Sequence, residues 1–331
     1  MGRLSEDELI KNYFAPLAGD GAFGLSDDAA LIAGKIGRDL IVTADMLICG
    51  VHFFSTDPPG AIARKALRVN LSDLAAKGAE PLGFLLTLAL PEDWTEPWLA
   101  GFALGLGEDS AAYKCPLLGG DTVKSPGALA ISITAFGVVP AGSMVMRGGV
   151  KAGDRIYVSG TIGDAALGLK IRLKAAADAP WIESLSPKES AFLAGRYLLP
   201  QPRVGLRAAL RAHAHAAIDI SDGFAGDLGK LLALSGVTAE VPLASLPLSQ
   251  AVRTALRSSP GLAETLLTGG DDYEILCAVA PAQSAAFESD AAAAGVVIAR
   301  VAIAMPGERA PSFRDESGKA LVLLKPSFQH F

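Results

Sequence analysis

The sequence predicts a mixed α/β protein made of two domains. Its 331 residues are 50% hydrophobic and only 19% charged, which provides apolar material for two ordinary cores. Apolar, strand-like runs alternate with helical segments along the whole chain. This pattern stops at Lys151-Ala-Gly-Asp154, and a new strand begins at Arg155. We therefore expect an N-terminal domain over residues 1–148 and a C-terminal α+β domain over residues 149–331.

Composition excludes several classes of protein. The net charge is −6 and no basic run occurs, so a nucleic-acid partner is not expected. Three scattered cysteines (Cys49, Cys115 and Cys277) fit neither a disulfide framework nor a zinc site, and they favour a reducing compartment. The uncharged run 125–146 contains three glycines and Pro140, so it predicts a buried strand with its turn and no membrane span. The acidic start lacks an apolar signal core, and we expect a cytoplasmic protein.

The first half of the chain predicts strands joined by two long helices. Pro58 and Pro59 suit the first turn of one helix, and Gly78 suits its left-handed end. A strand beginning at Asp39 carries Asp45 at its end. Gly119-Gly120-Asp121 is expected to form a turn with the acid at its tip. The expected strands are 39–47, 84–90, 116–118 and 128–139, and the expected helices are 58–77 and 97–113.

The helix over residues 58–77 combines two stripes. Leu67, Leu71 and Leu74 recur at helical spacing and form an apolar stripe. Asn70, Asp73 and Lys77 form a second, polar stripe. A carboxylate in so apolar a helix needs a partner, because its desolvation alone is costly. Either Lys77 pairs with Asp73 along the helix, or Asp73 contributes to a metal site.

The second half repeats the combination of strands, helices and Gly-Asp turns. A strand over 155–159 leads to the turn at Gly163-Asp164. A strand over 217–220 ends in two acids, Asp219 and Asp222, which flank Ser221 at the start of a helix over 224–234. A helix N-terminus binds phosphate well, but two acids suit an anion there only when cations lie between them. Thr268-Gly-Gly-Asp271-Asp272 precedes another strand.

These acids together predict a multi-metal phosphate site. They lie at the ends of apolar elements or within one, without a Cys or His grouping, and such hard oxygen ligands indicate Mg²⁺. The chain lacks the Gly-x-x-x-x-Gly-Lys-Ser/Thr loop and the protein-kinase motifs. His52 is either a packed residue or a functional one, and Arg147 is either a phosphate clamp or solvated. The acids are Asp28, Asp45, Asp73, Asp121, Asp219, Asp222 and Asp271.

The order of these motifs resembles that of the thiamine-monophosphate kinase family, over nearly the whole chain. The broader superfamily, which includes aminoimidazole ribonucleotide synthetase, shares only part of the set. The resemblance implies an aminoimidazole ribonucleotide synthetase-like fold, with an N-terminal ATP- and Mg²⁺-binding domain whose sheet pairs across a homodimer. The matching stretches are Leu25–Leu31, Thr43–Leu47, Gly50–Phe53, Val69–Ala76, Gly119–Thr122, Arg147–Gly149, Asp219–Gly223 and Gly269–Glu274.

The resemblance also implies a reaction: direct, in-line transfer of the γ-phosphoryl group of ATP onto thiamine monophosphate, giving thiamine diphosphate. No protein nucleophile takes part, and several Mg²⁺ ions neutralise the phosphates. The implied metal ligands are Asp28, Thr43, Ala44, Asp45, Asp73, Asp121, Asp219 and Asp222, with Thr43 and Ala44 acting through their carbonyls. The implied ATP contacts are Gly120, Asp121, Arg147 and Ser221, and the implied substrate contacts are His52, Asp271 and Phe328.

Three positions depart from the family pattern. Ser26 replaces the usual Gly, Asp271 replaces the usual Glu, and the ending Ser327–Phe331 matches only partly. Two alternative functions stay open: another ATP-dependent reaction of the superfamily, or a nucleotide-binding sensor without turnover. The sequence lacks the N-terminal cysteine of selenophosphate synthetases and the C-terminal cysteine of the hydrogenase-maturation enzymes.

Overall fold

The computed structural model describes residues 6–20, 22, 32, 34, 36–315, 317–325 and 327. They form two compact units: an N-terminal unit of Met1–Leu74 with Ala79–Met144, and a C-terminal unit of Ala75–Gly78 with Val145–Phe331. Both units combine sheets with helices, which confirms the predicted mixed α/β class. Among the residues described, no helix is long and apolar enough to cross a membrane.

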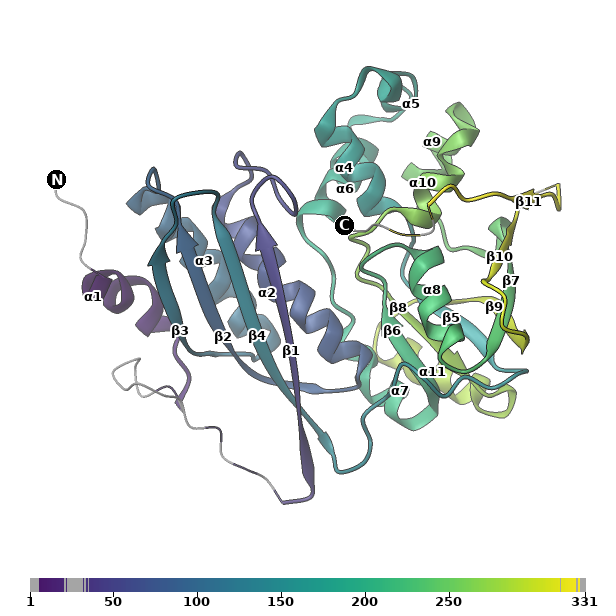
Figure 1. Ribbon diagram of the computed structural model, residues 1–331, viewed down its shortest axis with the longest axis horizontal. Helices are drawn as coiled ribbons and strands as arrows, with labels where there is room; N and C mark the ends of the chain where they lie inside the picture. The colour runs from purple at the N-terminus through teal and green to yellow at the C-terminus, as the bar shows by residue number, and fades with distance from the viewer. Residues whose placement is uncertain are drawn as a thin grey trace. The chain divides into compact units, whose positions relative to one another are not determined.

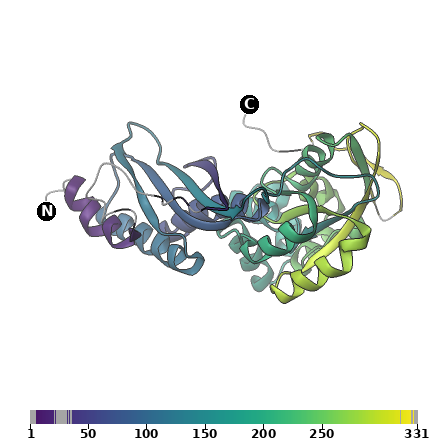
Figure 2. The ribbon, with the colours of Figure 1, turned by 90° about the horizontal axis from the view of Figure 1, so that it is seen from below.

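The N-terminal unit is a four-stranded sheet covered on one face by two helices (Figures 1 and 2). The strand order is β1-β4-β2-β3, so β1 and β3 are the two edges. The helices are α2 (Pro59–Ala76) and α3 (Glu96–Tyr113), and a short helix α1 (Glu6–Leu9) precedes the sheet. The strands are β1 (Arg38–Ile48), β2 (Glu80–Leu90), β3 (Leu117–Lys124) and β4 (Ala130–Pro140).

Two local predictions in this unit are wrong. Gly119-Gly120-Asp121 is not a turn but part of β3, which pairs in parallel with β2. Strand β1 continues to Ile48, so Asp45 lies inside the strand and not at its end. Gly120 is explained by packing: a Cβ atom there would lie 1.7 Å from the Leu86 carbonyl oxygen. Gly120 therefore marks a close approach of two strands, which a sequence pattern cannot distinguish from a turn.

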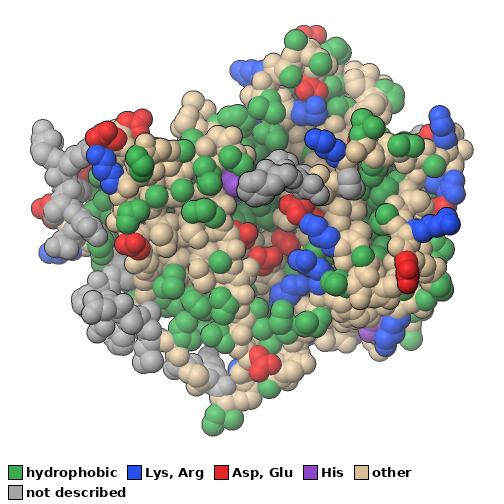
Figure 3. Space-filling model, in the orientation of Figure 1, with side chains coloured by type: hydrophobic (Ala, Val, Ile, Leu, Met, Phe, Trp, Pro, Cys, Tyr) green, Lys and Arg blue, Asp and Glu red, His purple; other side chains and the backbone are tan. Residues whose placement is uncertain are grey.

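The other face of this sheet is open and apolar. Leu40, Val42 and Met46 on β1 are each about half exposed or more, and Val123 on β3 is 47% exposed. Val42 pairs with Phe136 across the strands, so their side chains point to the same face. In Figure 3, hydrophobic side chains gather over these strands.

The C-terminal unit is built on a seven-stranded sheet of order β11-β10-β7-β9-β5-β8-β6. Its strands are β5 (Arg155–Ser159), β6 (Ala214–Asp219), β7 (Val237–Pro242), β8 (Ile275–Val279), β9 (Ile298–Pro306), β10 (Ser312–Arg314) and β11 (Ala320–Leu321). Its helices are α4 (Asp164–Leu173), α5 (Ala179–Glu183), α6 (Pro187–Leu198), α7 (Arg207–His213), α8 (Phe224–Ala233), α9 (Gln250–Ser258), α10 (Ala263–Thr268) and α11 (Ser284–Ala293).

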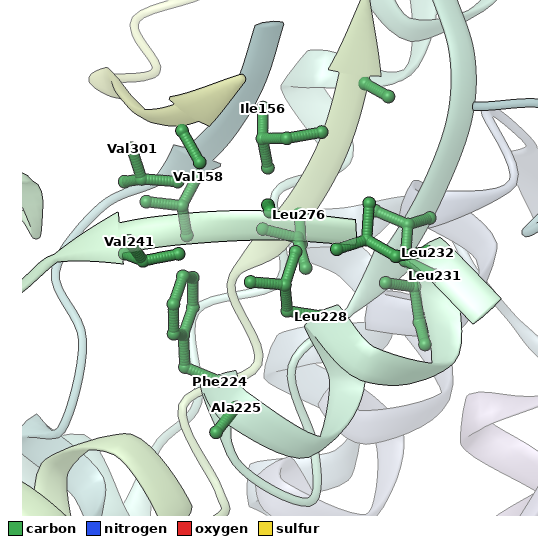
Figure 4. Packing of buried hydrophobic residues seen from close by; sticks show 14 of the residues in the cluster. Ile156, Val158, Phe224, Ala225, Leu228, Leu231, Leu232, Val241, Leu276 and Val301 are labelled. Atoms are coloured by element: carbon green, nitrogen blue, oxygen red, sulfur yellow. The ribbon is translucent and has the colours of Figure 1, made fainter. Parts of the chain in front are cut away.

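Helix α8 is seated on this sheet by a buried apolar cluster (Figure 4). Phe224, Leu228 and Leu231 point from the helix toward side chains of the sheet, among them Leu276 of β8 and Val241 of β7. All five side chains are fully buried. Because the helix begins directly after the Asp219–Gly223 loop, this packing fixes one end of that loop.

Helices α2 and α3 touch at a pair of glycines, and this contact yields a stability prediction. A Cβ atom at Gly105 would lie 2.5 Å from the Gly60 Cα atom. We expect Gly105→Ala to lower the free energy of unfolding by about 1–3 kcal/mol, because backbone must move to admit the methyl group. Gly195 of α6 has open space around it, so Gly195→Ala should raise stability by about 0.5–1 kcal/mol. Urea denaturation of both variants measures the contrast, and equal effects would contradict it.

Candidate active-site residues in the two units

The polar stripe of α2 attaches this helix to β1. The Asp73 carboxylate accepts a hydrogen bond from the Thr43 hydroxyl at 2.5 Å. The Asn70 side-chain oxygen accepts the backbone N–H of Asp45 at 3.1 Å, and its amide donates to the Ala66 carbonyl at 3.1 Å. Asn70 is fully buried, as are the leucines of the neighbouring stripe. The stripe thus brings three of the predicted ligand residues, Thr43, Asp45 and Asp73, to one place.

Asp73 is not paired along its helix. Lys77 donates instead to the Ala217 carbonyl at 2.9 Å, and Asp73 takes part in none of the ion pairs found among the residues described. Asp73 is half-buried, so its charge is only partly hydrated. A carboxylate in that position, beside a hydroxyl and a second carboxylate residue, offers the hard oxygen donors that Mg²⁺ prefers. The donor set therefore fits the implied metal.

Side chains alone do not complete the predicted cluster within the part of the chain that the structure describes. There, no three His, Cys, Asp or Glu side chains converge as a metal centre. Two predicted residues, Asp28 and Phe328, lie outside the described residues, as does the departure at Ser26. Ala44 is exposed on β1 between Thr43 and Asp45.

Asp121 lies at the opposite edge of the sheet from Asp45. Asp45 pairs with Ile133 of β4, Ile133 pairs with Leu86 of β2, and Leu86 pairs with Gly120 of β3. Three strand spacings separate the two edges, which is about 14 Å. Ligands of one Mg²⁺ ion lie about 2 Å from it. Within one copy of the chain, Asp121 therefore cannot share an ion with Asp45.

His52 is held just after β1 by three hydrogen bonds. The ring Nδ1 atom accepts a hydrogen bond from the backbone N–H of Ile48 at 3.0 Å. The backbone N–H of His52 donates to the Ile48 carbonyl at 3.0 Å. Lys65, which is buried, donates to the His52 carbonyl at 2.9 Å. Because Nδ1 accepts, the neutral ring carries its proton on Nε2. The half-buried ring is fixed as a donor at Nε2, which suits either a packed residue or a ligand contact.

In the C-terminal unit, the two acid-rich loops are hydrogen-bonded to each other along their backbones. The Asp271 N–H donates to the Ser221 carbonyl at 2.9 Å, and the Tyr273 N–H donates to the Ile220 carbonyl at 2.8 Å. In return, the Ile220 N–H donates to the Glu274 carbonyl at 2.8 Å. The loop with the predicted ATP contact and the loop with the predicted substrate contact therefore form one rigid element.

Glycines make this pairing possible. A Cβ atom at Gly270 would lie 2.3 Å from the Ser221 carbonyl oxygen, and one at Gly223 would lie 2.7 Å from the Thr268 backbone. Asp271 itself has φ of +75°, a left-handed conformation that Asp tolerates better than most residues. Its backbone conformation is thus a reason, apart from any ligand, for the short acid at this position.

Sequence reasoning missed two buried acids that hold the same loop. Glu274 is fully buried and accepts hydrogen bonds from Ser159 at 2.6 Å, Arg203 at 2.6 Å and Arg196 at 2.8 Å. Asp272, also fully buried, accepts from the Gly163 N–H at 2.7 Å at the start of α4. Burial raises the pKa of the Asp272 carboxyl well above its usual range, although the N–H groups of Gly163 and Ala165 oppose the shift. The sequence does contain a signal for these two acids: they directly precede the apolar strand β8, and residues beside such a strand are expected to be buried.

The remaining predicted residues lie around β6. Asp219 is its last residue and is buried, and Ser221 is half-buried. Arg147 is exposed and follows Met146, whose carbonyl accepts the Ala217 N–H of β6 at 2.9 Å. Asp222 forms an ion pair: its carboxylate accepts a hydrogen bond from Lys230 of α8 at 2.6 Å.

Comparison with known proteins agrees with this arrangement. Residues 26–139 match the family described as AIR synthase related protein, N-terminal domain, and residues 151–310 match its C-terminal domain. The thiamine-monophosphate kinase of Caulobacter vibrioides is 43% identical over 309 residues, covering 92% of this chain and 85% of that relative.

Two solved structures share the fold over more than nine tenths of this chain. The crystal structure of thiamine-monophosphate kinase from Stenotrophomonas maltophilia K279a is 38% identical, with a TM-score of 0.81 over 93% of this chain and 94% of that one. A structure of AaThiL complexed with AMPPCP and TMP is 28% identical, with a TM-score of 0.77 over 100% of this chain and 99% of that one. With this identity and coverage added to the motifs, the chain belongs to the thiamine-monophosphate kinase family.

Proposed function

We propose that this protein transfers the γ-phosphoryl group of ATP to thiamine monophosphate, giving thiamine diphosphate, in the cytoplasm as part of thiamine biosynthesis. Family membership supports the reaction, and the related structure complexed with AMPPCP and TMP supports the pair of substrates. The observation in this chain that carries the proposal is the half-buried Asp73 carboxylate, which is bonded to Thr43 and left without a basic partner among the residues described.

The domains divide the proposed work. In residues 1–148, Asp28, Thr43, Ala44, Asp45, Asp73 and Asp121 hold Mg²⁺, with Gly120 and Asp121 also contacting ATP and His52 contacting the substrate. In residues 149–331, Asp219 and Asp222 hold Mg²⁺, Ser221 contacts ATP, and Asp271 and Phe328 contact the substrate. Arg147, at the end of the first range, also contacts ATP. Bound Mg²⁺ supplies charge neutralisation for the crowded phosphates.

The chain's own residues bind and orient the reactants. Arg147 is exposed and free to reach a phosphate, and Ser221 lies just before the N-terminus of α8, where N–H groups favour anions. The hydrogen-bonded loops 219–223 and 269–274 hold the ATP contact and the substrate contact at a fixed spacing. Such positioning lets one phosphate attack another in line without a covalent enzyme intermediate.

The first prediction for this function concerns Asp73. Asp73→Asn should keep the fold but lower thiamine-monophosphate-dependent ADP release by at least about 100-fold, because an amide cannot offset a divalent charge. Asp39→Asn is a matched control at the far end of β1, where the exposed carboxylate accepts the Gly142 N–H. Wild-type turnover by Asp73→Asn at saturating Mg²⁺ would remove Asp73 from the site.

The same assay on the unchanged protein tests the alternative function. ATP binding without substrate-dependent turnover in the wild type would favour the nucleotide-binding sensor.

The second prediction concerns Asp271. Asp271→Asn keeps the tolerance for φ of +75° but removes the charge. Losing one charge-assisted hydrogen bond costs about 1.5–3 kcal/mol, so the KM for thiamine monophosphate should rise about 10-fold or more while the KM for ATP stays unchanged. Asp271→Glu should bind the substrate less tightly than the wild type, since the loop is pinned to Ser221 and Glu is less tolerant of this backbone conformation. Unchanged kinetics in Asp271→Asn would show that Asp271 has no substrate role.

The third prediction is a homodimer formed through the sheet of the N-terminal unit. Its open face exposes Leu40, Val42 and Met46, an area that a second copy would cover. Association also offers a position for Asp121 beside the β1 ligands of a second copy, whereas within one copy the width of the sheet separates them. Light scattering should give a dimer mass for the wild type and a monomer for Val42→Glu. Leu104→Glu, a change at an exposed leucine of α3, should remain dimeric. A monomeric wild type would contradict the dimer.

A further inference from the structure

Lys230, in the last turn of α8, lies between two carboxylates. One belongs to Asp227 in the first turn of this helix, and the other belongs to Asp222 just before it. The Lys230 Nζ atom donates to Asp222 at 2.6 Å and to Asp227 at 2.8 Å. Asp227 in turn accepts the Asp222 N–H at 2.9 Å through its other oxygen. The three residues form one network. Among the residues described, the ammonium group of Lys230 is the single cation that pairs with these two acids.

The two acids differ in what they can do. Asp227 is 1% exposed and is fixed on a helix whose apolar face is packed on the sheet. The Asp222 side chain is 38% exposed and that of Lys230 is 40% exposed, so both can change partners. Without Lys230, Asp227 would be a buried carboxylate that has lost its cation, whereas Asp222 can be hydrated.

A divalent ion bound to the Oδ2 atom of Asp222 would compete with the ammonium group, because this oxygen now accepts the hydrogen bond from Lys230. At that separation Lys230 and the ion repel each other. Since Lys230 stays paired with Asp227 when it leaves Asp222, the exchange does not strand a buried charge. The geometry thus provides two states of Asp222, bound to lysine or bound to metal.

We infer that Lys230 is the resident counter-ion of Asp222 and lowers the affinity of this position for Mg²⁺ until nucleotide phosphates are present. This inference rests on the proposed function, because it assigns Asp222 to an Mg²⁺ site. Phosphate oxygens add negative charge and further ligands, which together favour the metal over the lysine. Lys230 is accordingly a positioning residue that links metal loading to nucleotide binding.

The test measures metal binding to the nucleotide-free protein, with Mn²⁺ as the probe and electron paramagnetic resonance as the readout. Lys230→Met should bind one Mn²⁺ at least 10-fold more tightly than the wild type. Lys230→Arg keeps the cation and should resemble the wild type. Lys170→Met removes one positive charge from an ion pair with Asp178 elsewhere in the same unit, and it should change nothing. Asp222→Asn combined with Lys230→Met should lose the tightened site.

The outcomes separate this inference from the proposed function. Equal Mn²⁺ affinity in the wild type and Lys230→Met would overturn it, and so would an equal gain in Lys170→Met, which would reflect net charge alone. A tightened site that survives Asp222→Asn would place the metal elsewhere and also overturn it. If Lys230→Met does not fold, Lys230→Gln takes its place in the same comparison. Failure of the proposed function appears separately, as missing turnover of thiamine monophosphate in the wild type.

Discussion

A carboxylate that is removed from water must be compensated by cations, N–H groups or hydroxyls, and this constraint sorts the acids of this chain. Glu274 is compensated by two arginines and a serine, and Asp109 of α3 by Arg68 of α2 at 2.9 Å. Asp272 is compensated by N–H groups at the start of α4. These acids join elements that are far apart in sequence.

Two of the acids proposed to act on ligands have no cationic side chain as a partner among the residues described. Asp73 is half-buried with a hydroxyl as its partner, and Asp121 is exposed at an edge strand. Asp222 lies between the two groups, since its partner is a lysine that has a second, buried acid to pair with. The partner of each acid therefore adds information that the motif lacks: the structural acids Glu274 and Asp272 have buried, fixed partners. Asp73 has a hydroxyl partner, and Asp222 has a lysine that can exchange.

Close backbone contacts set the positions of the functional loops. In the C-terminal unit, Gly223 and Gly270 let two loops exchange hydrogen bonds along their backbones, and any side chain there would force them apart. In the N-terminal unit, the contact of Gly60 with Gly105 lets α2 and α3 approach. Helix α2 carries Asn70 and Asp73, so this second contact also affects the position of the proposed metal ligands.

The mixed α/β class, most helix and strand positions and the family could be predicted from the amino-acid sequence, because apolar periodicity and the order of the acid motifs are local properties of the chain. The partners of those acids could not. Thr43 and Asp73 are thirty positions apart along the chain, yet their side chains are 2.5 Å apart, and neither residue signals the other. Only the tertiary structure placed Asp121 at the far edge from Asp45 and put Lys230 on Asp222. Strand order and side-chain pairing depend on contacts between distant segments, which no local pattern encodes.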